Sequence, residues 1–189
     1  MGHFNLLAPR YDKLIGKYDA DRLFDFIGMP NDGLLLDAGG GTGRVARELC
    51  DKFAHIVVAD NSFGMLRQGI TRNNLLYVCT PIESLPFAPD AFRFIVMVDA
   101  FHHVIDQRIT VAELWRVLSP GGKIIIEEPD IRHWIVKIIA LLEKAALMRS
   151  HFLDVEKIEA LFNFTGAEID VVNKEYTSWV IVEKPASRF

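Results

Sequence analysis

The fold is decided by one stretch of the chain, Leu34-Leu35-Leu36-Asp37-Ala38-Gly39-Gly40-Gly41-Thr42-Gly43-Arg44. Its apolar start predicts a strand buried on both faces of a parallel sheet, and the apolar positions after residue 44 predict a helix. Between them, four glycines in five residues let the backbone adopt positive φ angles and let a ligand approach closely. The free N–H groups of the first helical turn favour an anionic group. Strand, glycine turn and helix together predict a nucleotide-type binding site.

The glycine spacing and the acid before it indicate which nucleotide the turn suits. Dinucleotide sites follow the pattern G-x-G-x-x-G, and the position of the last glycine is here Arg44. Asp37, at the strand end, would repel a pyrophosphate but suits a ligand that carries an α-amino group. The segment resembles the first motif of the class I S-adenosylmethionine-dependent methyltransferases. That resemblance implies that the amino-acid end of the cofactor is held by Asp37, Gly39, Gly40, Gly41 and Gly43. An NAD-dependent oxidoreductase remains the alternative.

A second predicted strand, Ala54 to Ala59, ends in Asp60, which lies 21 residues beyond Gly39. A carboxylate at this distance is expected to bind the ribose of either cofactor; the alternative is that it caps the next helix. The run from Asp60 and Asn61 through Met65 to Leu66 resembles the methyltransferase pattern D-x-S-x-x-M-L. In that pattern the methionine packs against adenine, whereas ordinary core packing is the other interpretation of Met65.

A third predicted strand, Leu75 to Cys79, leads into the run with the most specific resemblance. It reads Ile82-Glu83-Ser84-Leu85-Pro86-Phe87-Ala88-Pro89-Asp90-Ala91-Phe92, similar to the family pattern A-E-x-L-P-F-x-x-x-x-F. The family often places an Asp for the adenine amino group where this chain has Pro81. Proline lacks both a side-chain acceptor and a backbone N–H, so the resemblance leaves adenine to Met65 and to the backbone near Ile82. Pro81 also keeps open a cofactor-binding protein without turnover.

The fourth predicted strand, Phe92 to Val98, is followed by Asp99-Ala100-Phe101-His102-His103-Val104. Ligands in open α/β sheets bind beyond the carboxyl ends of the strands, so this run is expected to face the reacting methyl group, with Asp99 beneath it. The run resembles the family segment x-x-L-H-H-V. His102 or His103 is a candidate base for the methyl acceptor; alternatively, one histidine caps a helix and the other packs. Two adjacent histidines without a third ligand do not predict a metal site.

The C-terminal half predicts how the sheet is completed. An amphipathic helix, Ile109 to Leu118, precedes Pro120-Gly121-Gly122, which is expected to turn into a fifth strand and is another hallmark of the family. Asp154 is expected to cap a helix that runs through Phe164. Two successive strands, Glu168 to Val172 and Thr177 to Glu183, must then pair antiparallel. The prediction is a single domain, residues 1–189. Its fold is a three-layer α/β sandwich with a seven-stranded, mostly parallel sheet that ends in an antiparallel hairpin, the Rossmann-like methyltransferase fold.

Two segments are expected to complete the site. The run from Phe4 to Asp12 resembles the N-terminal segment of ubiquinone and menaquinone C-methyltransferases, so residues 1–30 are expected to form a lid with a helix from Asp19 to Ile27. Tyr11 then either covers the cofactor or simply packs. The helix predicted over residues 131–148 is apolar on most sides, which suits a wall for a hydrophobic substrate, a homodimer face or ordinary packing.

Composition limits the partners. The net charge of −4, from 21 basic and 25 acidic residues, argues against nucleic acid as the partner. The two cysteines are expected to be reduced thiols in a cytoplasmic protein. No segment predicts a signal peptide or a membrane span, although peripheral membrane contact stays open. The function implied by the resemblance is methyl transfer from S-adenosylmethionine to a small apolar or aromatic acceptor, which leaves S-adenosylhomocysteine.

Overall fold

The computed structural model describes residues 16–28, 33–69, 73–134, 136–137, 141 and 150–186. Seven strands form one sheet in the order β3-β2-β1-β4-β5-β7-β6. Their bounds are β1 Leu35–Ala38, β2 Ile56–Asp60, β3 Leu75–Cys79, β4 Phe92–Val98, β5 Leu118–Pro129, β6 Glu168–Lys174 and β7 Thr177–Glu183. The pairs among β1 to β5 are parallel, whereas β7 runs antiparallel to both β5 and β6. The predicted fold class is therefore confirmed, including the reversed hairpin.

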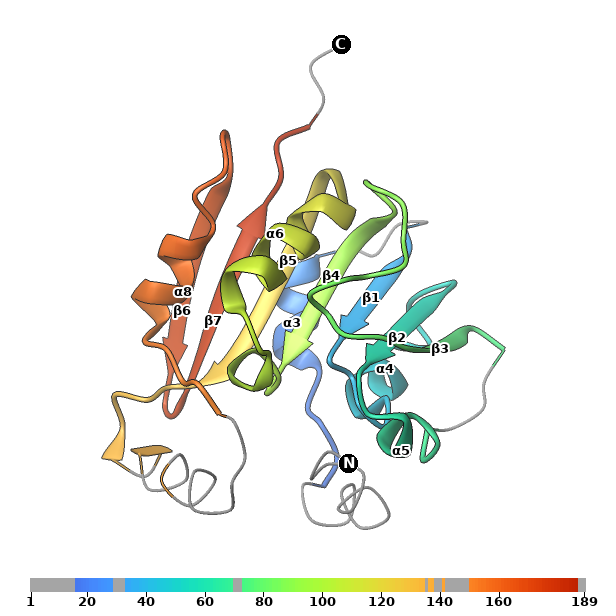
Figure 1. Ribbon diagram of the computed structural model, residues 1–189, viewed down its shortest axis with the longest axis horizontal. Helices are drawn as coiled ribbons and strands as arrows, with labels where there is room; N and C mark the ends of the chain where they lie inside the picture. Colours follow the sequence, from blue (N-terminus) through green and yellow to red (C-terminus); the bar gives the residue numbers. More distant parts are fainter. Residues whose placement is uncertain are drawn as a thin grey trace.

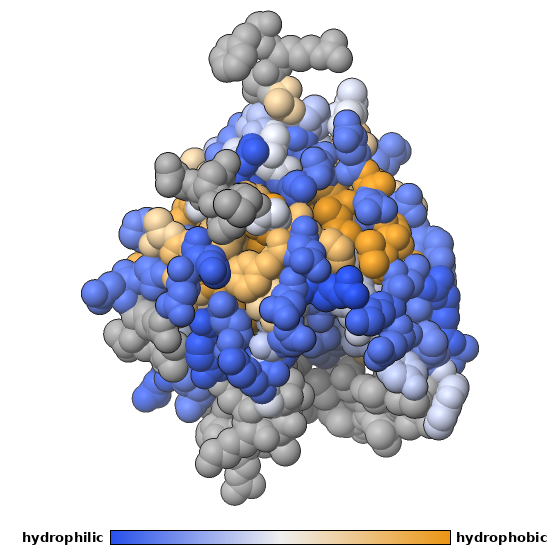
Figure 2. Space-filling model, turned by 180° about the vertical axis from the view of Figure 1, so that it is seen from behind, coloured by the Kyte–Doolittle hydropathy of each residue, from blue (hydrophilic) through white to orange (hydrophobic). Residues whose placement is uncertain are grey.

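Helices cover both faces of the sheet. Their bounds are α3 Asp21–Ile27, α4 Arg44–Leu49, α5 Phe63–Leu66, α6 Gln107–Val117 and α8 Val155–Leu161, with a 3-10 turn η2 at Phe101–His103. The helices α6 and α8 lie on one face, and α3 and α4 lie on the other (Figure 1). Figure 2 views the face of α3 and α4, where hydrophobic residues gather in the middle and hydrophilic residues surround them.

The alternation of side chains along the strands divides the core into two parts. Leu36 and Ile95 pack with the residues of α6 and α8, whereas their neighbours Leu35 and Phe94 pack with those of α3 and α4. Successive strand residues point to opposite faces of a sheet, so both kinds of position must be apolar when helices cover both faces. This requirement explains why β1 and β4 read as continuous apolar runs rather than as alternating ones.

Several boundaries differ from the predictions for local reasons. The helix α6 begins at Gln107 because the Asp106 carboxylate accepts hydrogen bonds from the N–H groups of Arg108 and Ile109, at 2.9 and 3.0 Å. The helix α8 ends at Leu161, three residues before the predicted end. Asp154 holds its N-cap position, but its carboxylate pairs with the Lys157 ammonium at 2.7 Å and caps no backbone N–H.

The Pro-Gly-Gly segment also differs from the predicted turn. It lies inside β5, where the register against β4 shifts between Phe92 and Phe94. Gly121 has a φ angle of +71°, and its N–H donates to the Lys184 carbonyl at 2.8 Å. The segment therefore forms an irregular start of the strand that stays hydrogen-bonded to the end of the chain, and not a separate turn.

Some predictions concern residues outside the described ranges. Tyr11 is one of them, and so is most of the helix predicted over residues 131–148. The lid, the substrate wall and the homodimer face therefore stay predictions, as does the single domain over residues 1–189. In the part of the chain that the structure describes, no helix is long and apolar enough to cross a bilayer.

Candidate cofactor-binding site

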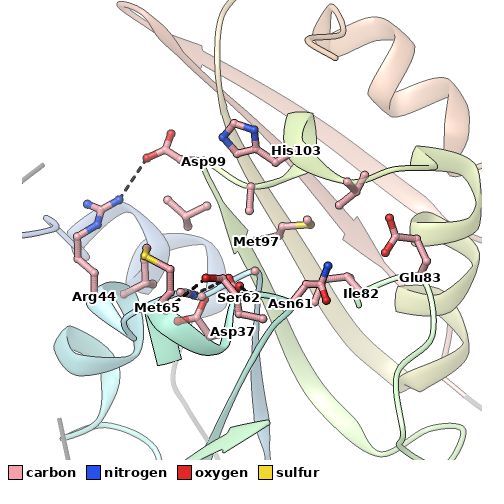
Figure 3. Close-up of a pocket in the computed structure, with 18 of the residues that line it drawn as sticks. Asp37, Arg44, Asn61, Ser62, Met65, Ile82, Glu83, Met97, Asp99 and His103 are labelled. Atoms are coloured by element: carbon pink, nitrogen blue, oxygen red, sulfur yellow. Dashed lines mark hydrogen bonds and ion pairs between the residues drawn. The ribbon is translucent and has the colours of Figure 1, made fainter. Parts of the chain in front are cut away.

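A pocket of about 260 Å³ opens beyond the carboxyl ends of β1, β2 and β4. In the view of Figure 3, Arg44 and Asp99 lie at one end of it, and Ile82 and Glu83 at the other. It is lined by Asp37, Gly39, Gly40, Gly41, Arg44, Val45, Asp60, Asn61, Ser62, Met65, Ile82, Glu83, Met97, Val98, Asp99, Ala100, His103, Val104 and Ile105. Most of the predicted cofactor residues thus meet in one place.

The glycine turn forms the floor beside β1. Gly41 has a φ angle of +55°, and its N–H donates to an Asp60 carboxylate oxygen at 2.9 Å. A Cβ at this position would lie 3.1 Å from the Met65 methyl group, so a larger residue would push on the pocket wall. Gly43 does not line the pocket. It has a φ angle of +74°, and a Cβ there would lie 2.6 Å from the Tyr77 hydroxyl, so it permits close packing against β3.

Asp37 is buried at the end of β1. Its carboxylate accepts a hydrogen bond from the Ala46 N–H at 3.2 Å. Burial raises the pKa of Asp37 to about 7, against the Ala46 hydrogen bond, which lowers it, and with help from the nearby charge of Asp60, which raises it further. Without a ligand this acid is therefore poised between its two protonation states near neutral pH, and a cation beside it would favour the charged form.

Asp60 uses both carboxylate oxygens to shape the neighbouring loops. One accepts from the Gly41 N–H, and the other from the Ser62 N–H at 2.6 Å. The helix α5 is capped instead by the Ser62 hydroxyl, which accepts from the Met65 N–H at 3.3 Å. Burial raises the pKa of Asp60, although both backbone hydrogen bonds oppose the shift. Each oxygen keeps a second lone pair for a ribose hydroxyl, and the ribose role stays a prediction.

Asp99, at the end of β4, pairs with Arg44, a residue to which the sequence analysis gave no role in the pocket. Asp99 follows the strand with a φ angle of +51°, and one of its oxygens lies 3.2 Å from a guanidinium nitrogen of Arg44. Behind Arg44, the ring of Tyr18 lies 5.2 Å from the guanidinium carbon. The Tyr18 hydroxyl donates to Glu127, which also accepts from the Trp179 indole at 2.8 Å. In the sequence Arg44 stands out only because it occupies the position of the last glycine in the dinucleotide pattern. Its place in the pocket lining was therefore not predicted.

The two histidines have different surroundings. His102 is buried and does not line the pocket; its Nδ1 lies 2.5 Å from a carboxylate oxygen of Glu128, and its ring stacks on Phe152. His103 lines the pocket, and its Nδ1 lies 3.3 Å from the Ser150 hydroxyl. Burial, with the charge of His102 as a smaller cause, lowers the pKa of His103 to about 3. His103 is thus a neutral imidazole that can accept or donate one hydrogen bond.

The remaining predicted positions lie at the adenine end or outside the pocket. Ile82 and Asn61 line it, and Pro81 is exposed and does not. Glu83 also lines it, and its carboxylate accepts from the Ile105 N–H at 2.6 Å. Sequence reasoning missed Glu83 as a pocket residue, although it is the Glu of the family pattern. Within the described ranges, no group of three or more potential metal ligands lies together.

Comparisons with known proteins show which family the chain resembles. Residues 36–126 match the model of a family described as "Methyltransferase domain". The demethylmenaquinone methyltransferase of Corynebacterium urealyticum is 37% identical over 116 residues, which are 61% of this chain and 49% of that protein. The solved S-adenosylmethionine-dependent methyltransferase of Mesorhizobium loti superposes with a TM-score of 0.74 at 15% identity, covering 86% of this chain and 96% of that one. The comparisons thus show similarity to the class I S-adenosylmethionine-dependent methyltransferases over about half of this chain. They confirm the predicted resemblance and its cofactor, S-adenosylmethionine, whereas the activity of this chain stays a proposal.

Two facts show that similarity to this methyltransferase family does not identify the reaction of this chain. The chain spans about half the length of the demethylmenaquinone methyltransferase it matches. The [4+2]-cyclase SpnF has the same fold, with a TM-score of 0.77 at 16% identity, and covers 97% of this chain and 94% of its own. The fold therefore accommodates more than one chemistry, and the reaction has to be argued from the pocket.

The charges of the pocket fit the cofactor of the methyltransferase family. Its described lining contains four carboxylic acids and one guanidinium group; the acids are Asp37, Asp60, Glu83 and Asp99, and the guanidinium belongs to Arg44. S-adenosylmethionine carries an ammonium, a sulfonium and a single carboxylate, together with two ribose hydroxyl groups that a carboxylate can bind. A lining in which acids outnumber bases suits this ligand. It does not suit a dinucleotide, whose pyrophosphate the acids would repel.

Proposed function

We propose that this protein transfers the methyl group of S-adenosylmethionine to a small apolar or aromatic acceptor. The observation that carries the proposal is Asp37, an acid directly below the glycine turn whose burial raises its pKa to about 7, although the charge of Arg44 lowers it. A ligand ammonium would stabilise its charged form. The names of the relatives, demethylmenaquinone and ubiquinone/menaquinone methyltransferases, support an aromatic ring as the acceptor.

Different residues of the pocket bind different parts of the cofactor. Asp37 and the turn from Gly39 to Gly41 hold the amino-acid end, Asp60 binds the ribose, and Met65 with Ile82 encloses the adenine. Asp99 lies beneath the methyl group. These residues lie at or just beyond the carboxyl ends of strands that belong to one sheet.

The cofactor supplies a methyl group on a positively charged sulfur, so the protein needs mainly to position the acceptor and to exclude water. Holding two reactants in line accounts for about 7–11 kcal/mol of a barrier in favourable cases. Met97, Val104 and Ile105 form an apolar part of the lining, against which an aromatic acceptor can pack. His103 faces the same space as a neutral imidazole and can accept the hydrogen bond of an acceptor hydroxyl. With its low pKa, it orients the acceptor better than it removes a proton.

The test is turnover with a labelled methyl group. The protein is incubated with S-adenosylmethionine labelled on that methyl group and with hydroquinones, catechols and amines in parallel, and both labelled product and S-adenosylhomocysteine are quantified. We expect equal amounts of the two with at least one hydroquinone or catechol. Tight binding of S-adenosylhomocysteine without any product across the panel would instead favour a cofactor-binding protein without turnover.

A further inference from the structure

Arg44 is a buried guanidinium group with donors to spare. Its side chain is 10% exposed, and a single hydrogen bond, from one terminal nitrogen to Asp99 at 3.2 Å, accounts for its polar contacts in the described structure. A guanidinium carries five N–H donors. No buried side-chain nitrogen or oxygen of the described residues lacks a hydrogen-bond partner, so the other nitrogens of Arg44 reach open space. That space is the pocket, which Arg44 lines.

Contacts with Tyr18 and Asp99 hold the guanidinium group of Arg44 in place. Tyr18 packs against the guanidinium, with 5.2 Å from its ring centroid to the guanidinium carbon. The hydroxyl of Tyr18 is in turn held by Glu127, and Asp99 anchors the terminal nitrogen. An arginine held in this way loses little side-chain freedom when it binds an anion, and its planar group can engage a carboxylate through two parallel hydrogen bonds.

Arg44 is also the one lysine or arginine among the described residues that line the pocket. The ligand of the proposed function has one anionic group, the carboxylate of its amino-acid end. In Figure 3 Arg44 lies with Asp99 at the end of the pocket away from Ile82, whereas Met65, the other residue assigned to the adenine, is labelled on the side of Arg44. In the chain Arg44 directly follows the glycine turn, to which the proposed arrangement gives the amino-acid end, so this positive side chain starts beside the expected position of the negative group of the ligand.

We infer that Arg44 binds the carboxylate of the amino-acid end of the methyl donor, with Tyr18 and Asp99 as positioning residues. The inference rests on the proposed function and adds a residue to it. It also explains why an arginine, and not a glycine, occupies the last position of the dinucleotide pattern. The acids Asp37 and Asp99 then face the ammonium and the sulfonium. Arg44 makes the pocket bind this donor in preference to thioethers of the same nucleoside that lack the carboxylate.

The experiment compares two ligands that differ only in the carboxylate. Dissociation constants are measured by titration calorimetry for S-adenosylhomocysteine and for its decarboxylated analogue, S-adenosyl-3-thiopropylamine. In the unmodified protein we expect S-adenosylhomocysteine to bind at least about tenfold more tightly, the factor that corresponds to a hydrogen-bonded charge pair. This comparison needs no variant and therefore does not depend on the folding of one.

The variant Arg44→Gln completes the cycle. We expect it to weaken S-adenosylhomocysteine by about tenfold to one-hundredfold and to leave the analogue within about threefold or bound more tightly, because Asp99 is released. Arg44→Lys is expected to restore part of the loss. The matched control is Arg47→Gln, which removes the same charge from the same helix at a residue outside the pocket lining, and which should leave both constants unchanged.

The outcomes separate the inference from the proposed function. Equal binding of the two ligands by the unmodified protein, or an equal loss for both in Arg44→Gln, would overturn the assignment of Arg44 while the proposed function stands. If the unmodified protein bound neither ligand, the proposed function itself would fail, and the assignment with it.

Discussion

Replacing Asp37 with asparagine should make the ligand-free protein more stable and at the same time impair cofactor binding. Burial raises the pKa of Asp37 from 3.8 to about 7. At about 1.36 kcal/mol for each pH unit, a difference of roughly three units corresponds to a cost on the order of 4 kcal/mol for the charged form in the folded state. Asparagine carries no charge, and its side-chain oxygen can still accept the Ala46 N–H. We therefore expect Asp37→Asn to be more stable than the unmodified protein at pH 8, by about 1–4 kcal/mol.

The sign of the pH dependence follows from the same values. An acid whose pKa is higher in the folded state than in the unfolded state keeps its proton longer when folded. Its contribution to the free energy of unfolding therefore falls as the pH rises from about 4 to about 7, and is constant above that range. Asp37→Asn lacks this contribution. Urea unfolding followed by tryptophan fluorescence at pH 5 and pH 8 measures both proteins. If the variant were no more stable at pH 8, with an unchanged difference between the two pH values, the account of Asp37 would be wrong.

Binding should respond in the opposite direction. A ligand ammonium pairs with the charged form of Asp37, so the affinity of the unmodified protein for S-adenosylhomocysteine should increase as the pH rises from about 5.5 to about 7.5. Asp37→Asn should bind at least about tenfold more weakly at pH 7.5 and should lose this dependence. Calorimetric titrations at the two pH values measure both effects. An affinity that does not change with pH in the unmodified protein would contradict a contact between Asp37 and the amino group.

Three further changes test other parts of the site. Gly41→Val should abolish binding of S-adenosylhomocysteine, because a side chain there meets Met65 at a φ angle of +55°; retained affinity in a calorimetric titration would show that the ligand does not cross this turn. His103→Ala should lower kcat by at least about tenfold with little change in S-adenosylhomocysteine affinity, and because the pKa of His103 lies near 3, this residue should give no step in the activity profile between pH 5 and pH 8. Glu128→Ala should reduce the free energy of unfolding by about 3–5 kcal/mol, since it removes the partner of the buried His102 and of the Phe101 N–H; a loss below 1 kcal/mol in chemical denaturation would show that this pair does not hold η2 in place.

The sheet was predictable from the sequence because each strand is an apolar run with a clear end. The predicted bounds of β3, β4 and β7 agree with the structure, and acids close β1 and β2 near the pocket. The antiparallel hairpin followed from the short link between its two strands, since successive strands joined in this way must reverse direction. The glycine turn was likewise local, because strand, turn and helix are neighbours in the chain.

The parts that were missed depend on contacts between distant segments. The Tyr18 hydroxyl meets Glu127 across 109 positions, and Arg44 meets Asp99 across 55. No periodicity or short motif encodes such pairs. Glu128 lies within an apolar strand, and only the pairing of β4 with β5 brings it under the turn that carries His102. Gly43 belongs to the glycine motif, yet its close neighbour is Tyr77 from β3, which becomes evident only once β3 is placed beside β2.

The most direct measurement of the central claim compares ligands on the unmodified protein. The account requires the pocket to bind a nucleoside with an amino-acid end rather than a dinucleotide, so the melting temperature is measured with S-adenosylhomocysteine and, separately, with NAD. At a concentration one-hundredfold above its dissociation constant, a ligand adds about 2.7 kcal/mol to the free energy of unfolding. We expect S-adenosylhomocysteine to raise the melting temperature by several degrees and NAD to leave it unchanged. A rise with NAD and none with S-adenosylhomocysteine would contradict the account.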